Sequence, residues 1–209
     1  MADDAALLEL MRVIGAGDNA GAQVLLHGKP ELATRALGIG GSRSAPTEFF
    51  LETCRAQIYR GDTALHVAAF AYDVELVRRL VAMGADVRAK NRRGAEPLHA
   101  AANGSPGAND ARHASQADVI AALVEVGAAV DAPAAGGVTP LHRAVRNRCP
   151  AAVRALLAAG ADPQRPNDSG STAIALAHHN TGRSGSGSPE AHAAQAEILA
   201  IFAAHRRSM

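Results

Sequence analysis

The sequence predicts an all-α solenoid of about five stacked helix pairs, and three observations carry that prediction. The segment GDTALHVAAF at residues 61–70 returns as GAEPLHAAAN from Gly94 and as GVTPLHRAVR from Gly137, with a weaker echo, GSTAIALAHH, from Gly170. The first and last intervals are 33 residues long and the middle one is 43. Each unit also carries the apolar spacing of two short helices. Such units cannot bury their faces alone, so a fixed period indicates stacking.

The first helix of each unit has a recognisable start. Thr63 and Thr139 are suited to the N-cap, and Pro140 follows at the first helical position, where its missing N–H costs nothing. Glu96 stands at the equivalent place in the middle repeat. We therefore expect the first helix of that repeat to begin less firmly.

The second helix of each unit is amphipathic and ends at a glycine. Its apolar residues follow an i, i+3, i+4 pattern, seen first at Val77, Leu80 and Val81. A glycine follows each of these helices, at positions 84, 127 and 160. Glycine readily adopts the left-handed conformation that closes a helix, so these glycines predict C-caps.

The motifs TALHVAA, PLHAAA, TPLHRAV, MGADV, VGAAV and AGADP together resemble the ankyrin-repeat family over residues 61 to about 178. In that family the histidine of the TPLH motif hydrogen-bonds the backbone of the neighbouring unit. The resemblance therefore implies a structural role for His66, His99 and His142, rather than a metal-binding or catalytic one. Ala175 replaces this histidine in the last unit, as suits a unit with no further neighbour.

The resemblance implies a single ankyrin-type domain, residues 1–209, with atypical caps at both ends. Its parts, in chain order, are an N-terminal cap unit at 1–28, an insert at 29–60, repeats at 61–93, 94–136 and 137–169, and a C-terminal cap unit at 170–209. Gly28 occupies the C-cap place of the first unit. Ser188 and Pro189 predict the start of the last helix.

Inserts interrupt the first, third and fifth units. The insert at 29–60 contains the flexible stretch GIGGSRSAP and then TEFFLETCRAQIY, whose spacing predicts a short helix near residues 47–57. We expect that helix to bury Phe49 or Phe50 against the first units. The stretches at 104–114 and 181–189 are rich in Gly and polar residues, which predicts loops.

Charge and composition narrow the possible partners. The formal net charge of the 209 residues is +1, which gives no general attraction to nucleic acid or anionic membranes. The acidic start MADDAALLELM is unlike a signal peptide, and no apolar run reaches the ~20 residues of a membrane span. Cys54 and Cys149 form no metal or redox motif and are expected to be free thiols. We therefore expect a cytoplasmic, monomeric protein.

No arrangement of residues suggests catalysis, a cofactor or a metal. Paired carboxylates, Ser/His/Asp sets and nucleotide-binding fingerprints all lack recognisable spacing. His178 and His179 are neighbours on an expected helix and point about 100° apart, so they do not easily share one metal ion. We expect a protein that is not an enzyme.

Five of the six aromatic residues lie between positions 49 and 72. One interpretation is that they anchor the insert on the repeats. The other is a partner site, since aromatic residues are enriched at binding hot spots. Similarly, the run RAKNRR at residues 88–93, in the connecting segment that ends the repeat at 61–93 (the first finger), is either a solvated turn or part of a binding surface.

In the resembled family, the connecting fingers and the first helices line a concave binding face. We therefore expect a protein partner, acidic or of mixed charge, to be bound there. The candidate binding residues are Phe70, Tyr72, Arg88, Lys90, Arg92, Arg93, Asn103, Arg146 and Asn147.

The predicted function is a non-catalytic protein–protein interaction module that presents a rigid concave groove. The alternative is a regulatory protein that binds a small ligand or a metal in a pocket beneath the insert at 29–60. A protein partner predicts an open groove with an aromatic rim, whereas a small ligand predicts an enclosed, mostly apolar cavity.

Overall fold

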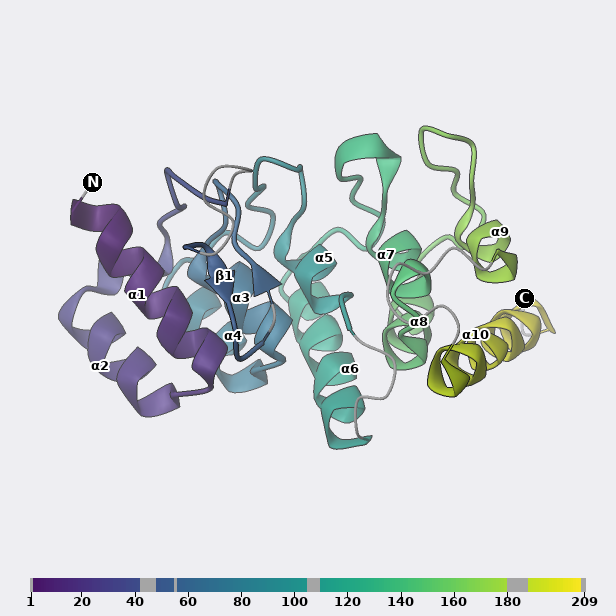
Figure 1. Cartoon of the computed structure of the whole chain (residues 1–209), viewed down its shortest axis with the longest axis horizontal. Coiled ribbons are helices and arrows are strands. Elements are labelled where there is room, and N and C mark those ends of the chain that lie inside the picture. The colour runs from purple at the N-terminus through teal and green to yellow at the C-terminus, as the bar shows by residue number, and fades with distance from the viewer. Residues whose placement is uncertain (1, 42–47, 55, 105–109, 180–187, 208–209) are drawn as a thin grey trace.

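The computed structural model describes residues 2–41, 48–54, 56–104, 110–179 and 188–207, and it confirms the predicted helical solenoid (Figure 1). Within these ranges ten α-helices form five consecutive pairs. The pairs are α1 (Ala2–Ala16) with α2 (Asn19–Gly28), α3 (Ala64–Ala71) with α4 (Val74–Ala82), α5 (Pro97–Ala101) with α6 (Asp110–Glu125), α7 (Pro140–Arg146) with α8 (Pro150–Ala158), and α9 (Ala173–His178) with α10 (Pro189–Arg207). They succeed one another along the long axis of the molecule.

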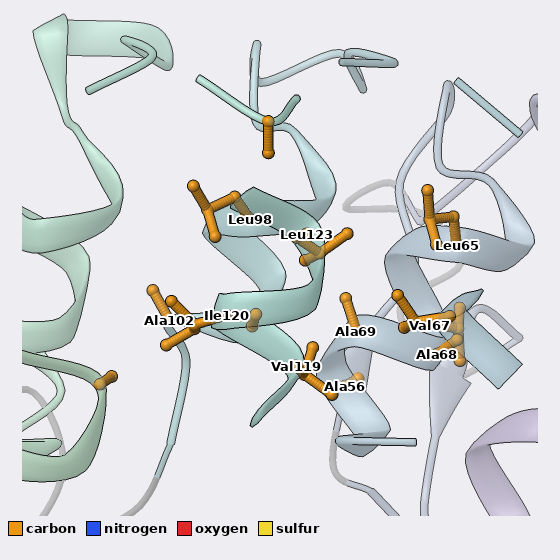
Figure 2. Close-up of a cluster of buried hydrophobic side chains, with 14 of the residues drawn as sticks. Ala56, Leu65, Val67, Ala68, Ala69, Leu98, Ala102, Val119, Ile120 and Leu123 are labelled. Carbon is orange, nitrogen blue, oxygen red and sulfur yellow. The ribbon is translucent and has the colours of Figure 1, made fainter. Parts of the chain in front are cut away.

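The helices stack in two layers. The first helices α3, α5, α7 and α9 contact one another in order, with α1 packed on α3, and the second helices α4, α6, α8 and α10 do the same. Small side chains allow the close approach of the first helices, since Ala68, Ala69, Ala101 and Ala102 are fully buried. Figure 2 shows three of these alanines beside the larger Leu and Ile side chains of the same cluster.

The predicted helix starts are present. Thr63 and Thr139 each accept a hydrogen bond from the backbone N–H three residues on, at 3.4 Å. Ser188 does the same for α10, accepting from the N–H of Ala191 at 3.2 Å. At Glu96 the first turn of α5 is held instead by the imidazole of His99, which accepts from the Glu96 N–H at 3.1 Å.

The insert forms a β-hairpin, so the helix predicted near residues 47–57 is wrong. Strand β1 (Phe50–Leu51) pairs antiparallel with β2 (Ala56–Gln57). Burial alternates along both strands, since Phe49 and Leu51 are buried on either side of half-buried Phe50, and Ala56 and Ile58 are buried on either side of half-buried Gln57. That period of two is the pattern of a strand lying on a core. The expected burial of Phe49 is confirmed.

Backbone hydrogen bonds join the insert to the first full repeat. The N–H of Leu37 donates to Asp62 O at 2.8 Å, and the N–H of Gly61 donates to Leu37 O at 2.7 Å. Gly41 N donates in turn to Ile58 O at 2.9 Å. A short 3-10 helix, η1 (Pro30–Ala33), links α2 to this segment. The hairpin is therefore a fixed part of the solenoid.

The other two inserts are described in part. Helix α6 begins at Asp110, so residues 110–114 of the loop predicted at 104–114 are helical. Ala and Arg in DARHA are good helix formers, which accounts for the extension. Residues 42–47, 105–109 and 180–187, which carry the rest of the loop predictions, lie outside the described residues. No helix within the described ranges is long and apolar enough to cross a membrane.

The turn glycines confirm the predicted register of the units. Gly84, Gly127 and Gly160 have φ values of 92°, 97° and 89°. Gly28 differs, because it is the last residue of α2 and has no positive φ. The C-cap of α2 is Lys29 instead.

Gly160 and Gly28 allow a matched test of this conformational requirement. A Cβ at either position meets no atom within 4 Å, so only the backbone conformation separates them. Gly160→Ala should lower the free energy of unfolding by about 1–2 kcal/mol, because L-residues are strained at this φ. Gly28→Ala should be neutral or stabilising by up to about 1 kcal/mol. Urea denaturation followed by circular dichroism measures both, and equal effects would contradict the assigned turn.

Candidate functional site

Three equivalent histidines bridge consecutive units. His66, His99 and His142 are 4%, 0% and 0% exposed. Their Nδ1 atoms accept from the backbone N–H groups of the residues that precede their helices, at 3.2, 3.1 and 3.3 Å. Their Nε2 atoms lie 3.1, 3.0 and 3.0 Å from the carbonyl oxygens of Ala95, Val138 and Ser171 in the next unit. Since Nδ1 accepts, Nε2 carries the proton and donates.

Burial keeps these imidazoles neutral. It is the largest cause that lowers the pKa of all three histidines, and it lowers the pKa of His99 to about 3. Protonation would also abolish the acceptor role of Nδ1. The three side chains are therefore structural groups and are poorly suited to acid–base chemistry at neutral pH.

A cavity of about 290 Å³ lies between the hairpin and the first helices. The hairpin contributes Ala56 to Tyr59, and helix α3 contributes Val67 and Phe70. The far side is formed by Asn103, just after α5, by Arg143 of α7 and by Asn147, the C-cap residue of α7. Three successive units and the insert thus contribute to one site.

Residues at one equivalent position of three successive repeats line the cavity. Val67, Ala100 and Arg143 occupy the position directly after the bridging histidine in their units, and all three line the cavity. Two units carry an apolar side chain there, and the third carries a cation. The apolar and charged ends of the site therefore result from a change at one repeat position.

Arg143 is half-buried at the charged end. Its Nη1 donates to His99 O at 3.3 Å. Within the described part of the chain, no carboxylate lies at ion-pair distance from its guanidinium. Burial, followed by the charge of nearby Arg93, lowers the pKa of Arg143 to about 10, so it remains a cation at neutral pH.

Asp62 is a buried carboxylate whose hydrogen bonds hold neighbouring residues of the cavity lining in place. Its Oδ1 accepts from Asn91 Nδ2 at 2.8 Å, and its Oδ2 accepts from the Tyr59 N–H at 2.7 Å. Asn91 in turn accepts from the N–H groups of Arg93 and Ala95, at 2.9 and 3.1 Å. One network therefore couples the hairpin, the start of α3 and the first finger.

Glu96 is the second carboxylate of the cavity. It is 3% exposed, and no hydrogen-bond partner for its Oε2 is found among the described residues. Its Oε1 lies 3.8 Å from Lys90 Nζ. Burial is the main cause that raises the pKa of this carboxyl.

The first finger places two cations on an aromatic ring at the edge of the cavity. The guanidinium groups of Arg92 and Arg93 lie 5.2 and 5.3 Å from the ring centroid of Tyr59. Arg93 Nη1 also donates to the Tyr59 hydroxyl at 3.2 Å. The aromatic residue that meets the basic finger is therefore Tyr59 of the insert, which the sequence reasoning did not single out.

The structure brings together some of the candidate binding residues and separates others. Phe70, Asn103 and Asn147 line the cavity, and Asn147 Nδ2 donates to Asn103 Oδ1 at 2.7 Å. Tyr72 is engaged between units, where its hydroxyl bonds Asn103 O and accepts from Gln116 Nε2. Arg88 Nε donates to Gly127 O at 3.0 Å, away from Tyr59.

Sequence reasoning missed Arg143, Asp62 and Glu96. Alignment of the repeats gives a signal for Arg143, because it is the only charged residue among its equivalents Val67 and Ala100. Asp62 and Glu96 carry no such signal, since both fall where polar residues are ordinary.

The described residues offer little for metal or thiol chemistry. Among them, no group of three or more His, Cys, Asp or Glu side chains is placed to hold a metal ion. Cys149 is buried, and burial raises the pKa of its thiol to about 12. The site is therefore suited to recognition through charge, hydrogen bonds and apolar area.

Removal of one histidine bridge should destabilise the protein. His142→Ala leaves the Ser171 carbonyl and the Thr139 N–H without their partner, so the free energy of unfolding should fall by roughly 1–3 kcal/mol. His178→Ala, at an exposed position, is the control and should change it by less than about 0.5 kcal/mol. Similar losses of unfolding free energy in both variants would show that the His142 bridge does not stabilise the protein more than an exposed histidine does.

The same bridges predict a loss of stability in acid. A histidine with a lowered pKa stabilises the fold fully above its unfolded-state pKa of 6.5, and this stability is lost as pH falls toward about 3. For His99 the loss at pH 5 is about 2 kcal/mol. His99→Gln should therefore reduce the decline in unfolding free energy between pH 7.5 and pH 5 by about that amount. The raised pKa of Glu96 changes stability with pH in the opposite direction, but Glu96 is present in both proteins. An equally steep decline in the variant would contradict the lowered pKa assigned to His99.

Family models match two stretches of the chain. Residues 10–110 match a model described as ankyrin repeats in three copies, and residues 123–177 match one described as ankyrin repeats in many copies. No curated protein matches the chain at a significant level. The 33-residue period, the histidine bridges between units and these two matches show that the chain belongs to the ankyrin-repeat family, whose repeats generally mediate protein–protein interaction.

Proposed function

We propose that the chain is a non-catalytic module that binds a partner protein on its concave face, between the first finger and helix α7. The observation that carries the proposal is the cavity walled by the hairpin, with Arg92 and Arg93 stacked on Tyr59 at its edge. Aromatic and arginine side chains dominate binding hot spots. The contact of Arg92 and Arg93 with Tyr59 supports a surface shared by part of the basic finger and one member of the aromatic cluster.

The module acts by presenting a surface that is ordered before the partner arrives. Backbone hydrogen bonds fix the hairpin on the first repeat, and the Asp62 network holds the first finger against it. A preorganised surface avoids part of the entropy cost of binding. Phe70 and Tyr59 supply contact area, while the arginines orient the partner. We place this action in the cytoplasm and assign it to a monomer.

A small ligand in the same cavity is the second candidate function. The volume of about 290 Å³ falls just below the usual range for small-molecule sites. The cavity lies beneath the insert, where this alternative requires it. Its lining includes Asp62, Glu96 and Arg143 and is more polar than most small-molecule pockets. We therefore favour the protein partner.

Reversal of the finger charge tests the proposed surface. Arg92→Glu with Arg93→Glu should slow association with a captured partner, because charges at the rim of an interface act mostly on the encounter rate. The effect should shrink above physiological salt, where the screening length falls below about 8 Å. Capture from a source-cell lysate, mass spectrometry and surface plasmon resonance with the purified partner measure this.

The matched control is Arg206→Glu with Arg207→Glu, a second pair of adjacent exposed arginines, at the end of α10. This variant makes the same change in net charge far from the cavity. Equal slowing in both variants would show a general charge effect and would remove the proposed surface. Unchanged binding in the Arg92 and Arg93 variant would do the same.

A further inference from the structure

The cavity contains a cation, Arg143, that forms no ion pair with a carboxylate of the described residues. Arg143 is equivalent to Val67 and Ala100 of the two preceding repeats. Its Nη1 donates a hydrogen bond to the carbonyl oxygen of His99. A guanidinium has five N–H donors in a planar fork that matches a carboxylate. In the described ranges no carboxylate is within ion-pair distance of this fork. The remaining donors are thus open to an incoming acceptor.

Further cations surround this side chain. Arg93 is close enough to be the second cause, after burial, that lowers the pKa of Arg143, and Arg92 lies beside it over Tyr59. Lys90 is on the same finger. The electrostatic field at the mouth of the cavity therefore favours an anion, although the whole chain is almost neutral.

The two carboxylates of the cavity do not reverse this preference. Asp62 already accepts hydrogen bonds on both oxygens, from Asn91 and from the Tyr59 N–H. Glu96 has a raised pKa because it is buried, and Lys90 lies 3.8 Å away. The charge of Asp62 also acts on Arg143, but less strongly than that of Arg93. A carboxylate entering beside Arg143 thus meets guanidinium donors that no carboxylate of the described residues binds.

The cavity also offers apolar side chains, beside the polar residues of its lining. Val67 and Phe70 of α3 line it, together with Ala56 and Ile58 of the hairpin. The volume of about 290 Å³ corresponds to about ten water volumes, which is room for one or two side chains but not for a folded element. The occupant therefore combines a carboxylate with a neighbouring apolar group.

We propose that this cavity recognises an acidic residue in an extended segment of the partner protein, an Asp or Glu whose carboxylate binds Arg143 and Arg93 while an adjacent apolar residue packs on Phe70 and Val67. This inference rests on the proposed function, because it names the partner chemistry for the same surface. It goes further by making Arg143, rather than the exposed finger alone, the residue that determines specificity.

A linear-peptide display library, selected on the whole protein, tests the proposal. The enriched peptides should carry Asp or Glu next to an apolar residue. For a synthetic peptide of the enriched sequence, Arg143→Gln should weaken binding about tenfold or more in fluorescence anisotropy. Arg143→Lys keeps the charge but loses the fork, so its loss should be intermediate. Arg165→Gln, in the exposed third finger, should leave binding within about twofold of the wild type.

A double-mutant cycle separates recognition from a structural role of Arg143. Replacing the peptide carboxylate by its amide should weaken binding to the wild type and have little further effect on Arg143→Gln. Circular dichroism and thermal unfolding check that both Arg143 variants fold. The proposal is overturned if no peptide is enriched, if enriched peptides lack acidic residues, or if acid and amide peptides bind equally well.

Two further measurements show whether the acidic-residue inference or the proposed function has failed. Free glutarate that binds as tightly as the peptide would assign the cavity to a small carboxylic acid and would overturn the peptide proposal. If acidic peptides fail while a captured partner still depends on Arg92 and Arg93, the acidic-residue inference falls and the proposed function stands. If acidic peptides fail and the captured partner does not depend on Arg92 and Arg93 either, both the acidic-residue inference and the proposed binding surface are wrong.

Discussion

The histidine bridge is the interaction on which the rest of the solenoid depends. Each imidazole closes the first turn of its own helix through Nδ1 and reaches the next unit through Nε2. The acceptors Ala95, Val138 and Ser171 each come one residue after the glycine that begins their unit, at positions 94, 137 and 170. The sequence separation is 29 residues in the bridges of His66 and His142 and 39 in the bridge of His99. The extra residues of the third unit come after its first helix in the sequence, and the distance from His99 to its acceptor is nevertheless 3.0 Å.

Small side chains make the stacking possible and leave the core without large anchors. Fully buried alanines on α3 and α5 bring the first helices together, so the stabilising contacts are many and small. Each unit contacts mainly its neighbours, which is typical of repeat proteins. The few aromatic residues are concentrated where the insert joins the repeats. There Phe49 is buried as an anchor, and Tyr59 remains at the surface under two arginines. The anchor interpretation thus holds for Phe49, and the partner-site interpretation stays a prediction for Tyr59.

The period and the capping residues predicted the helices because these signals are local. The hairpin was not predicted because the spacing of Phe50, Cys54 and Gln57 also fits a helix. The competing alternation at Phe49, Leu51, Ala56 and Ile58 is interrupted by the turn between the strands. The sequence suggested a pocket beneath the insert only as an alternative, and its lining could not be predicted, since it depends on how the hairpin meets three stacked units. Arg143 is visible in the aligned repeats as a charge at an apolar position, but its isolation from carboxylates depends on the fold.

Arg143 is a residue that the stacking of the repeats does not require. Burying part of a guanidinium without an ion-pair partner costs free energy, and the equivalent positions show that a small apolar residue satisfies the stacking. Glu96 is buried, and one of its oxygens has no hydrogen-bond partner among the described residues, which is a second cost in the same cavity. Groups that weaken a fold and lie together in a cavity are better explained by binding than by stability. Among the described residues, the solenoid supplies a rigid frame of bridged and capped helices, while Arg143 lies in the cavity where the proposed partner can satisfy its remaining donors.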